Sequence, residues 1–228
     1  MRWLGKVEEA AASWDAEYAR GRYAGEPPVP FTEDIVQAAK RAGLHDGIYL
    51  GCGSGRNLVP MIEAGLDLIG LDISATAIEQ LVARVPDRRD RLVVGDLSAL
   101  PADRRYDLVI ALQVLQHGTR ADTHALLEDA SERVAPGGLF CVRLNAVGTD
   151  LGHAADVVER HEDGSFSVLY REGPKAGLTV HFWAAAELHH EALAAGLEPV
   201  LRPRPHSTWR PDGRSQWMQF EAIYRRPS

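Results

Sequence analysis

The sequence predicts an α/β fold built on a parallel sheet, and three observations lead to this class. Apolar runs of strand length alternate with stretches of helical periodicity from residue 47 onward. The 228 residues suffice for one domain with a large core, and 45% of them are apolar. No repeat and no long apolar window interrupts the pattern. Such alternation places parallel strands side by side with helices on both faces.

The central elements follow from this periodicity. Short runs rich in Val, Ile and Leu, bounded by Gly and Asp, are typical of strands, and amphipathic stretches separate them. The strands are expected at 47–51, 67–73, 90–96, 106–112 and 137–147, and the helices at 57–64, 74–85 and 121–135.

The two ends of the chain add further elements. Residues 3–21 repeat apolar side chains at helical spacing, "GEPPVPF" breaks the chain, and 32–43 predicts a second helix. After the fifth strand, "SFSVLYREGPKAGLTVHFW" predicts a hairpin turning at "EGPKAG". A helix at 184–195 and two last strands, "EPVLRP" and "QWMQFEAIYRR", follow, and "RPHSTWRPDGRS" is expected to join these strands as a loop.

Composition and net charge indicate which partners and which cell compartment to expect. The net charge of −7 argues against nucleic acid as the main partner, because phosphate binding needs a basic surface. Cys52 and Cys141 lie in apolar stretches without CxxC spacing and are expected to be buried thiols. The N-terminal segment lacks the apolar core of a signal peptide, so we expect a cytoplasmic protein without a membrane partner.

The stretch "YLGCGSGRN" follows the first strand and contains three alternating glycines. Its G-x-G-x-G spacing does not fit the G-x-G-x-x-G of dinucleotide folds. A strand-to-helix turn of this kind presents free N–H groups that suit a phosphate or carboxylate, although a plain tight turn without a ligand is the alternative. Asp72 and Asp96 end the next two strands, where they would reach a ribose diol and an adenine amino group at the same sheet edge.

In this order, "YLGCGSGRN", "LIGLDIS", "VVGDLSALP", "YDLVIALQVLQH" and "VAPGGLF" resemble the motifs of class I S-adenosylmethionine-dependent methyltransferases. The resemblance covers roughly residues 44–145. The N-terminal segment and the hairpin are similar to the tellurite-resistance and thiopurine methyltransferase relatives, which act on small molecules. The resemblance implies a three-layer Rossmann-like sandwich with a seven-stranded, mostly parallel sheet whose last strand is antiparallel.

The resemblance also implies an organisation and a cofactor site. One domain over 1–228 would comprise an N-terminal helical lid (1–43), a cofactor-binding core (44–147), a hairpin insertion that caps the acceptor (148–183), and a C-terminal helix with the last two strands (184–228). S-adenosylmethionine would be the cofactor and S-adenosylhomocysteine the product. The residues implied to bind it are Gly51, Gly53, Gly55, Asn57, Asp72, Ile73, Asp96, Leu97 and Gln113, with Trp14 and Tyr18 contributed by the lid.

One position departs from the family pattern. Tyr49 stands where the family usually has an acid that helps to hold the methionyl amine. Asp46 lies three residues before Tyr49, and the alternation of a strand points it to the opposite face. The amine must therefore find another acceptor.

Methyl transfer from a sulfonium needs a general base only when the acceptor still carries its proton. His117, just after the fourth strand, is the candidate base, with a surface or helix-capping histidine as the alternative. Arg143 is a candidate contact for an acidic acceptor or else a salt-bridge partner. His181 and Trp209 are further candidates beside the acceptor, and the spacing of the nine histidines predicts no metal site.

We therefore expect a methyltransferase that acts by in-line displacement on a small-molecule acceptor. The resemblance implies a soft acceptor atom such as sulfur, or an oxygen, nitrogen or carbon of a secondary metabolite. A protein or RNA methyltransferase is one alternative, but it would need a binding module or basic strip that is not evident. A protein that binds S-adenosylmethionine without transferring its methyl group is the other, because Tyr49 departs from the family. The acceptor and the oligomeric state are not fixed by the sequence.

Overall fold

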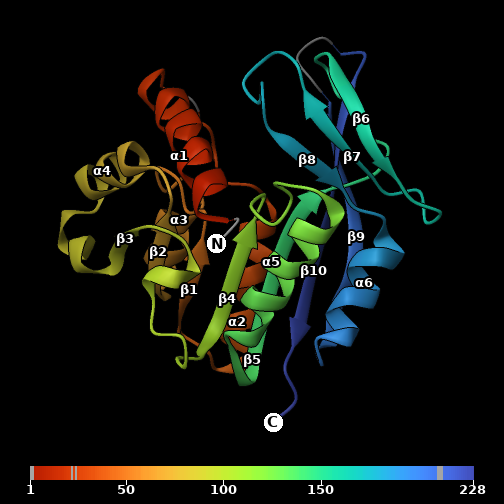
Figure 1. Ribbon diagram of the computed structural model, residues 1–228. Helices are drawn as coiled ribbons and strands as arrows, with labels where there is room; N and C mark the ends of the chain where they lie inside the picture. Colours follow the sequence, from red (N-terminus) through yellow and green to blue (C-terminus); the bar gives the residue numbers. More distant parts are fainter. Residues whose placement is uncertain (1–2, 22, 24, 210–212) are drawn as a thin grey trace. The chain divides into compact units, whose positions relative to one another are not determined.

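The computed structural model describes residues 3–21, 23, 25–209 and 213–228, and their order of elements is drawn in Figure 1. The chain forms two compact units, Met1–Ile110 and Ala111–Ser228, which are described separately. The expected single domain over 1–228, with its internal divisions, stays a prediction. Every helix in the described ranges is too short or too polar to cross a bilayer.

The first unit consists of short buried strands joined by helices. Parallel pairing joins β1 to β2 and β2 to β3. β1 and β2 are buried along almost their whole length, as strands covered on both faces are. The helices and strands of this unit are α1 (Trp3–Ala19), α2 (Phe31–Ala42), β1 (Asp46–Leu50), α3 (Leu58–Glu63), β2 (Asp67–Asp72), α4 (Ala75–Arg84), β3 (Leu92–Val94) and β4 (Tyr106–Leu112), and β4 runs on into the second unit.

Two short 3₁₀ turns complete this unit, at Pro86–Arg91 and Leu97–Ala99. α4 begins with a capped turn, because the Ser74 hydroxyl accepts a hydrogen bond from the Ala77 main-chain nitrogen at 3.1 Å. The start of α4 is therefore fixed directly after the end of β2.

The second unit contains α5 (Arg120–Glu132), β5 (Val134–Asn145), α6 (Ala185–Ala194), β9 (Glu198–Trp209) and β10 (Gln216–Arg225). The order in the main sheet is β3-β2-β1-β4-β5-β10-β9, and β10 is antiparallel to both β5 and β9. The predicted seven-stranded, mostly parallel sheet with an antiparallel last strand is confirmed.

A separate three-stranded sheet follows β5. It consists of β6 (Ala155–Arg160), β7 (Phe166–Tyr170) and β8 (Thr179–Phe182), with antiparallel pairing of β6 to β7 and of β7 to β8. The expected hairpin is the β7–β8 pair. β6 was not predicted, because its side chains are mostly exposed and show no apolar alternation.

β9 also differs from the expectation. The strand was expected to end near residue 203, yet residues 204–209 of the expected loop continue it. Residues 210–212 of that loop lie outside the described residues. The prolines that argued for a loop are tolerated because β9 is the edge strand of the main sheet.

The glycine turn after β1 depends on the close approach of α4. Gly55 has a φ of +87°, and a Cβ atom there would stand 2.4 Å from Leu81 Cδ1 of α4 and 3.0 Å from Val59 Cγ2. Gly55 is therefore required both by its backbone conformation and by the space available.

We expect Gly55→Ala to lower the free energy of unfolding by on the order of 2–4 kcal/mol, because left-handed strain and a clash with Leu81 add. Gly65→Ala is the matched control, since Gly65 has a φ of +101° with nothing within 4 Å of its Cβ position. Urea denaturation of both variants measures the difference. Equal losses would show that the approach of α4 does not constrain Gly55.

Candidate functional site

The glycine turn adopts the left-handed conformations that its sequence predicted. Gly51, Gly53 and Gly55 have φ angles of 64°, 56° and 87°. The turn starts from the sheet, where the main-chain nitrogen of Cys52 donates to the Leu71 carbonyl oxygen at 2.9 Å. The Gly55 main-chain nitrogen donates to the Cys52 carbonyl oxygen at 3.1 Å, so the free N–H groups expected for this turn are partly used within the protein.

Asp72, the last residue of β2, is bound to this turn. Its Oδ2 accepts the Gly53 main-chain N–H at 2.7 Å, and its Oδ1 accepts the Ser74 main-chain N–H at 2.9 Å. Burial raises the pKa of Asp72 and outweighs the opposing effect of the two hydrogen bonds, and the neighbouring Asp15 raises it further. A carboxylate offers about four acceptor positions, so the geometry leaves this group capacity for further donors.

The N-terminal helix lies over the turn within the first unit. Asp15 Oδ1 accepts the Ser74 hydroxyl at 2.5 Å and the Thr76 main-chain N–H at 3.0 Å. The Tyr18 side chain is buried, and its hydroxyl stands 2.3 Å from where a Cβ atom on Gly53 would lie. Half-buried Trp14 lies beside Tyr18, with ring centroids 6.4 Å apart. α1 thus supplies both predicted lid aromatics near the turn.

Tyr49 occupies the position of the usual acid and points into the core. It is 1% exposed, and its hydroxyl accepts the Asn57 Nδ2 donor at 3.1 Å. The Asn57 Oδ1 accepts the main-chain N–H of Val29 at 2.9 Å. These contacts use the Asn57 side chain to join the segment before α2 to the core. The role of Asn57 in cofactor binding stays a prediction.

The ends of β2 and β3 combine a polar group with accessible apolar side chains. Asp96 is exposed, and its Oδ1 accepts the Ser98 main-chain N–H at 2.9 Å and the Ser98 hydroxyl at 2.6 Å. Ile73 and Leu97 are half-buried, and Val94 is 51% exposed. Their roles at the adenine stay predictions.

In the second unit, the segment after β4 carries a strained residue. Gln113 has a φ of +62°, which side-chain-bearing residues rarely adopt, and its main-chain nitrogen donates to the Arg143 carbonyl oxygen at 2.6 Å. Strain of this kind is concentrated at functional sites. Burial lowers the pKa of His117 to about 3, the Lys175 charge lowers it too, and a hydrogen bond with the Gln113 backbone acts in the opposite direction.

Two further predicted residues lie in different environments. Arg143 is buried, with its Nε 3.2 Å from Glu221 Oε1 and an Nη donating to Gln219 Oε1 at 2.7 Å. This is the salt bridge that the sequence left open as an alternative. Trp209, at the end of β9, is 64% exposed.

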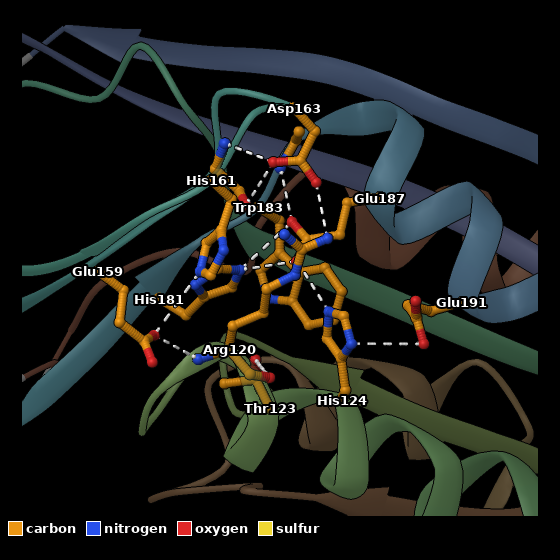
Figure 2. Close-up of polar contacts among 12 residues, drawn as sticks. Arg120, Thr123, His124, Glu159, His161, Asp163, His181, Trp183, Glu187 and Glu191 are labelled. Carbon is orange, nitrogen blue, oxygen red and sulfur yellow. Dashed lines mark hydrogen bonds and ion pairs between the residues drawn. The ribbon is translucent and has the colours of Figure 1, made fainter.

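His181, the remaining candidate, is fully buried in a polar cluster that the sequence did not reveal (Figure 2). Its Nε2 lies 3.0 Å from Glu187 Oε1, and its Nδ1 lies 2.9 Å from Ser167 Oγ. The cluster members come from positions spread between 120 and 191, so no local spacing unites them. One feature of the sequence could have indicated this cluster, namely the acid Glu187 in the first turn of the predicted helix. In the structure Glu187 accepts the Ala184 main-chain N–H at 3.1 Å.

Comparison with known proteins agrees with these features. Residues 48–140 match the family model described as a methyltransferase domain. A ubiquinone biosynthesis O-methyltransferase of Rhodopseudomonas palustris (strain BisA53) is 33% identical over 99 residues, which are 42% of this chain and 38% of that protein. The chain thus spans about two fifths of the length of the curated relatives it matches.

Solved structures share the fold over almost the whole chain. The 1,6-didemethyltoxoflavin-N1-methyltransferase of Burkholderia thailandensis, solved with S-adenosylhomocysteine, has a TM-score of 0.64 at 17% identity and covers 97% of this chain and 90% of its own. The magnesium protoporphyrin IX methyltransferase of Synechocystis PCC 6803, solved with S-adenosylmethionine, has a TM-score of 0.63 at 16% identity and 96% coverage of both chains. Residues 48–140 thus match a methyltransferase domain, and the chain shares its fold with solved S-adenosylmethionine-dependent methyltransferases.

Proposed function

We propose that this protein transfers the methyl group of S-adenosylmethionine to a small-molecule acceptor. The observation that carries the proposal is the bond between Asp72 and the Gly53 main-chain nitrogen. It holds the carboxylate that ends β2 against the glycine turn that follows β1. A ligand with a ribose diol suits a carboxylate held at this place.

The residues of the first unit fit the nucleoside half of the cofactor. Asp72 has acceptor capacity left for the two ribose hydroxyls, and Asp96 is exposed for an amino group. Ile73 and Leu97 are half-buried apolar side chains that suit the faces of an adenine ring. Tyr49 is buried and bound by Asn57, so the methionyl amine must be held by a group other than the side chain at this position.

When bound, S-adenosylmethionine supplies a methyl group already activated by its sulfonium. The protein then contributes orientation and exclusion of water. Tyr18 and Trp14 of α1 suit a cover over the turn, because Asp15 and the bond from Gln80 Nε2 to the Tyr18 carbonyl oxygen at 3.0 Å fix this helix against α4.

The proposed part of His117 follows from its weak basicity. A group with a pKa of about 3 stays neutral at physiological pH and takes up a proton poorly. We therefore assign His117 to fixing the strained Gln113 backbone rather than to removing a proton. Acceptors that need no strong base suit such an arrangement.

The nature of the acceptor is a proposal drawn from the relatives. The curated relative is named as an O-methyltransferase, and the Burkholderia neighbour as an N-methyltransferase. We propose a small molecule with a hydroxyl or ring or amino nitrogen as acceptor. The net charge of −7 supports a small-molecule acceptor rather than nucleic acid. The two free, buried cysteines support the proposal that the protein works in the cytoplasm.

A second candidate function rests on Tyr49. A protein that holds S-adenosylmethionine without transferring its methyl group would tolerate the loss of the family's acid. Assay of methyl transfer against a panel of phenols and amines separates the two functions. Binding of the cofactor without turnover of any acceptor would favour the second.

For the wild-type protein, isothermal titration should detect S-adenosylmethionine and S-adenosylhomocysteine but not NAD. We expect Asp72→Asn to weaken both by about 10- to 100-fold, because the carboxylate charge and one acceptor group are lost. Asp67→Asn is the control, since Asp67 begins the same strand and pairs with Arg88 and Arg91. Unchanged affinity in Asp72→Asn would remove Asp72 from the site.

The free energy of unfolding should fall as the pH is lowered from 6.5 toward 3, because unfolded His117 binds a proton that folded His117 does not. The contribution is about 1.4 kcal/mol per pH unit within this window. We expect His117→Gln to flatten this part of a urea-denaturation series. His190→Gln, at an exposed position of α6, should leave the slope unchanged. A variant with the wild-type slope would show that His117 is not a buried neutral group.

A further inference from the structure

Glu187 is the centre of a buried polar cluster in the second unit (Figure 2). Its side chain is 0% exposed, and its Oε1 faces three nitrogen donors. Arg120 Nε lies at 2.9 Å, His124 Nε2 at 2.8 Å and His181 Nε2 at 3.0 Å from this oxygen. Burial alone would raise the pKa of Glu187, but hydrogen bonds from His124 and His181 lower it to about 2. Glu187 is therefore ionised and accepts at every one of these contacts.

The other nitrogen of the His181 ring, Nδ1, faces the Ser167 hydroxyl, whose proton is already donated to another acceptor. Ser167 Oγ donates to Glu159 Oε2 at 2.8 Å. Burial would raise the pKa of Glu159, but hydrogen bonds from the Arg120 main chain and from Ser167 lower it, so this carboxylate has no proton to give. The 2.9 Å contact between His181 Nδ1 and Ser167 Oγ then requires the ring nitrogen to donate.

We infer that His181 is a buried imidazolium, protonated at both ring nitrogens, and that it positions the segment Gln116–Gly118 after β4. A neutral imidazole donates through one nitrogen only and would lose either Glu187 or Ser167. His181 is thus a positioning residue, in place of the acceptor contact expected from the sequence. The positioning role rests on the proposed methyl transfer, because the segment Gln116–Gly118 contains His117. The protonation state of His181 does not depend on it.

The charges around the ring are consistent with a cation. The guanidinium of Arg120 pairs with Asp163 at 2.7 Å and with Glu187 at 2.9 Å, and the Arg120 main-chain nitrogen donates to Glu159 Oε2 at 3.0 Å. A protonated His181 reduces the negative surplus, as buried charges require. The other titratable groups facing the cluster are His161, whose ring centroid lies 6.3 Å from that of His181, His124, and Glu191, 3.4 Å from His124 Nδ1.

The main chain of β8 transmits this anchoring to the segment after β4. The His181 main-chain nitrogen donates to the Gln116 carbonyl oxygen at 2.9 Å, and the Gly118 nitrogen donates to the Thr179 carbonyl oxygen at 2.8 Å. His117 and Val180 form the bridge between these bonds. The side chain of His181 therefore holds the same strand whose main chain holds His117.

Nitrogen NMR of the full chain labelled at its histidine rings tests the protonation state directly. At about pH 8, where exposed histidines are neutral, we expect the ring of His181 to have both nitrogens protonated. The disappearance of that signal in His181→Asn assigns it. A neutral tautomer for His181 at this pH would overturn the inference, whether or not the protein methylates any acceptor.

Ser167→Ala tests the positioning role, because it removes the Nδ1 acceptor and leaves the strand pairing of β7 intact. We expect the imidazolium signal to be lost at about pH 8 and the Gly118 amide to exchange faster, with turnover falling about three- to tenfold and cofactor affinity unchanged. His190→Asn on exposed α6 surface is the control and should change none of these. Wild-type exchange at Gly118 in Ser167→Ala would overturn the positioning role. If Ser167→Ala speeds amide exchange at Gly118 but the wild-type protein methylates no acceptor, the proposed function is refuted and the positioning role is kept.

Discussion

The carboxylate of Asp72 is the point on which the first unit depends. It ends β2, binds the turn after β1 through Gly53, and binds the residue before α4 through Ser74. Removing a carboxylate from water is costly, and the two main-chain donors offset part of that cost. Because Asp15 of α1 binds the Ser74 hydroxyl, the N-terminal helix is held at the same place. The acid proposed to bind ribose thus also connects the end of β2 to the glycine turn and to the start of α4.

Buried charge organises the second unit in a similar way, but around side chains of separate segments. Glu187 gathers donors from α5 and β8, while Glu159 of β6 accepts from Ser167 of β7 and from the start of α5. The three-stranded sheet has only a small apolar core, formed by Val168, Tyr170, Val180 and Phe182. The polar cluster adds contacts between this sheet and the helices α5 and α6.

The sequence predicted what local patterning controls and missed what distant contacts control. Buried parallel strands are continuous apolar runs, so β1, β2 and β4 lay within a residue or so of their expected bounds. β6 has no such pattern, and it forms only because β7 offers an edge. Asp72 was found because a strand end and a following turn mark it. The cluster around His181 was not, because its carboxylate Glu187 also binds His124, which lies 63 positions away in the sequence. The pairing of Tyr49 with Asn57 likewise needed the fold.

The protonation states constrain the chemistry that the proposed reaction can use. Burial lowers the pKa of His117 to about 3, and His181, which we infer to be an imidazolium, has no lone pair free, so neither ring suits a general base near neutral pH. Under the proposed function, acceptors that do not depend on either ring suit this arrangement, such as a neutral amine, a ring nitrogen or a phenolate. An aliphatic alcohol would keep its proton and react slowly, since orientation raises the rate without changing the nucleophile. Under the proposed function, these two histidines therefore favour acceptors whose nucleophilic atom need not lose a proton before it attacks.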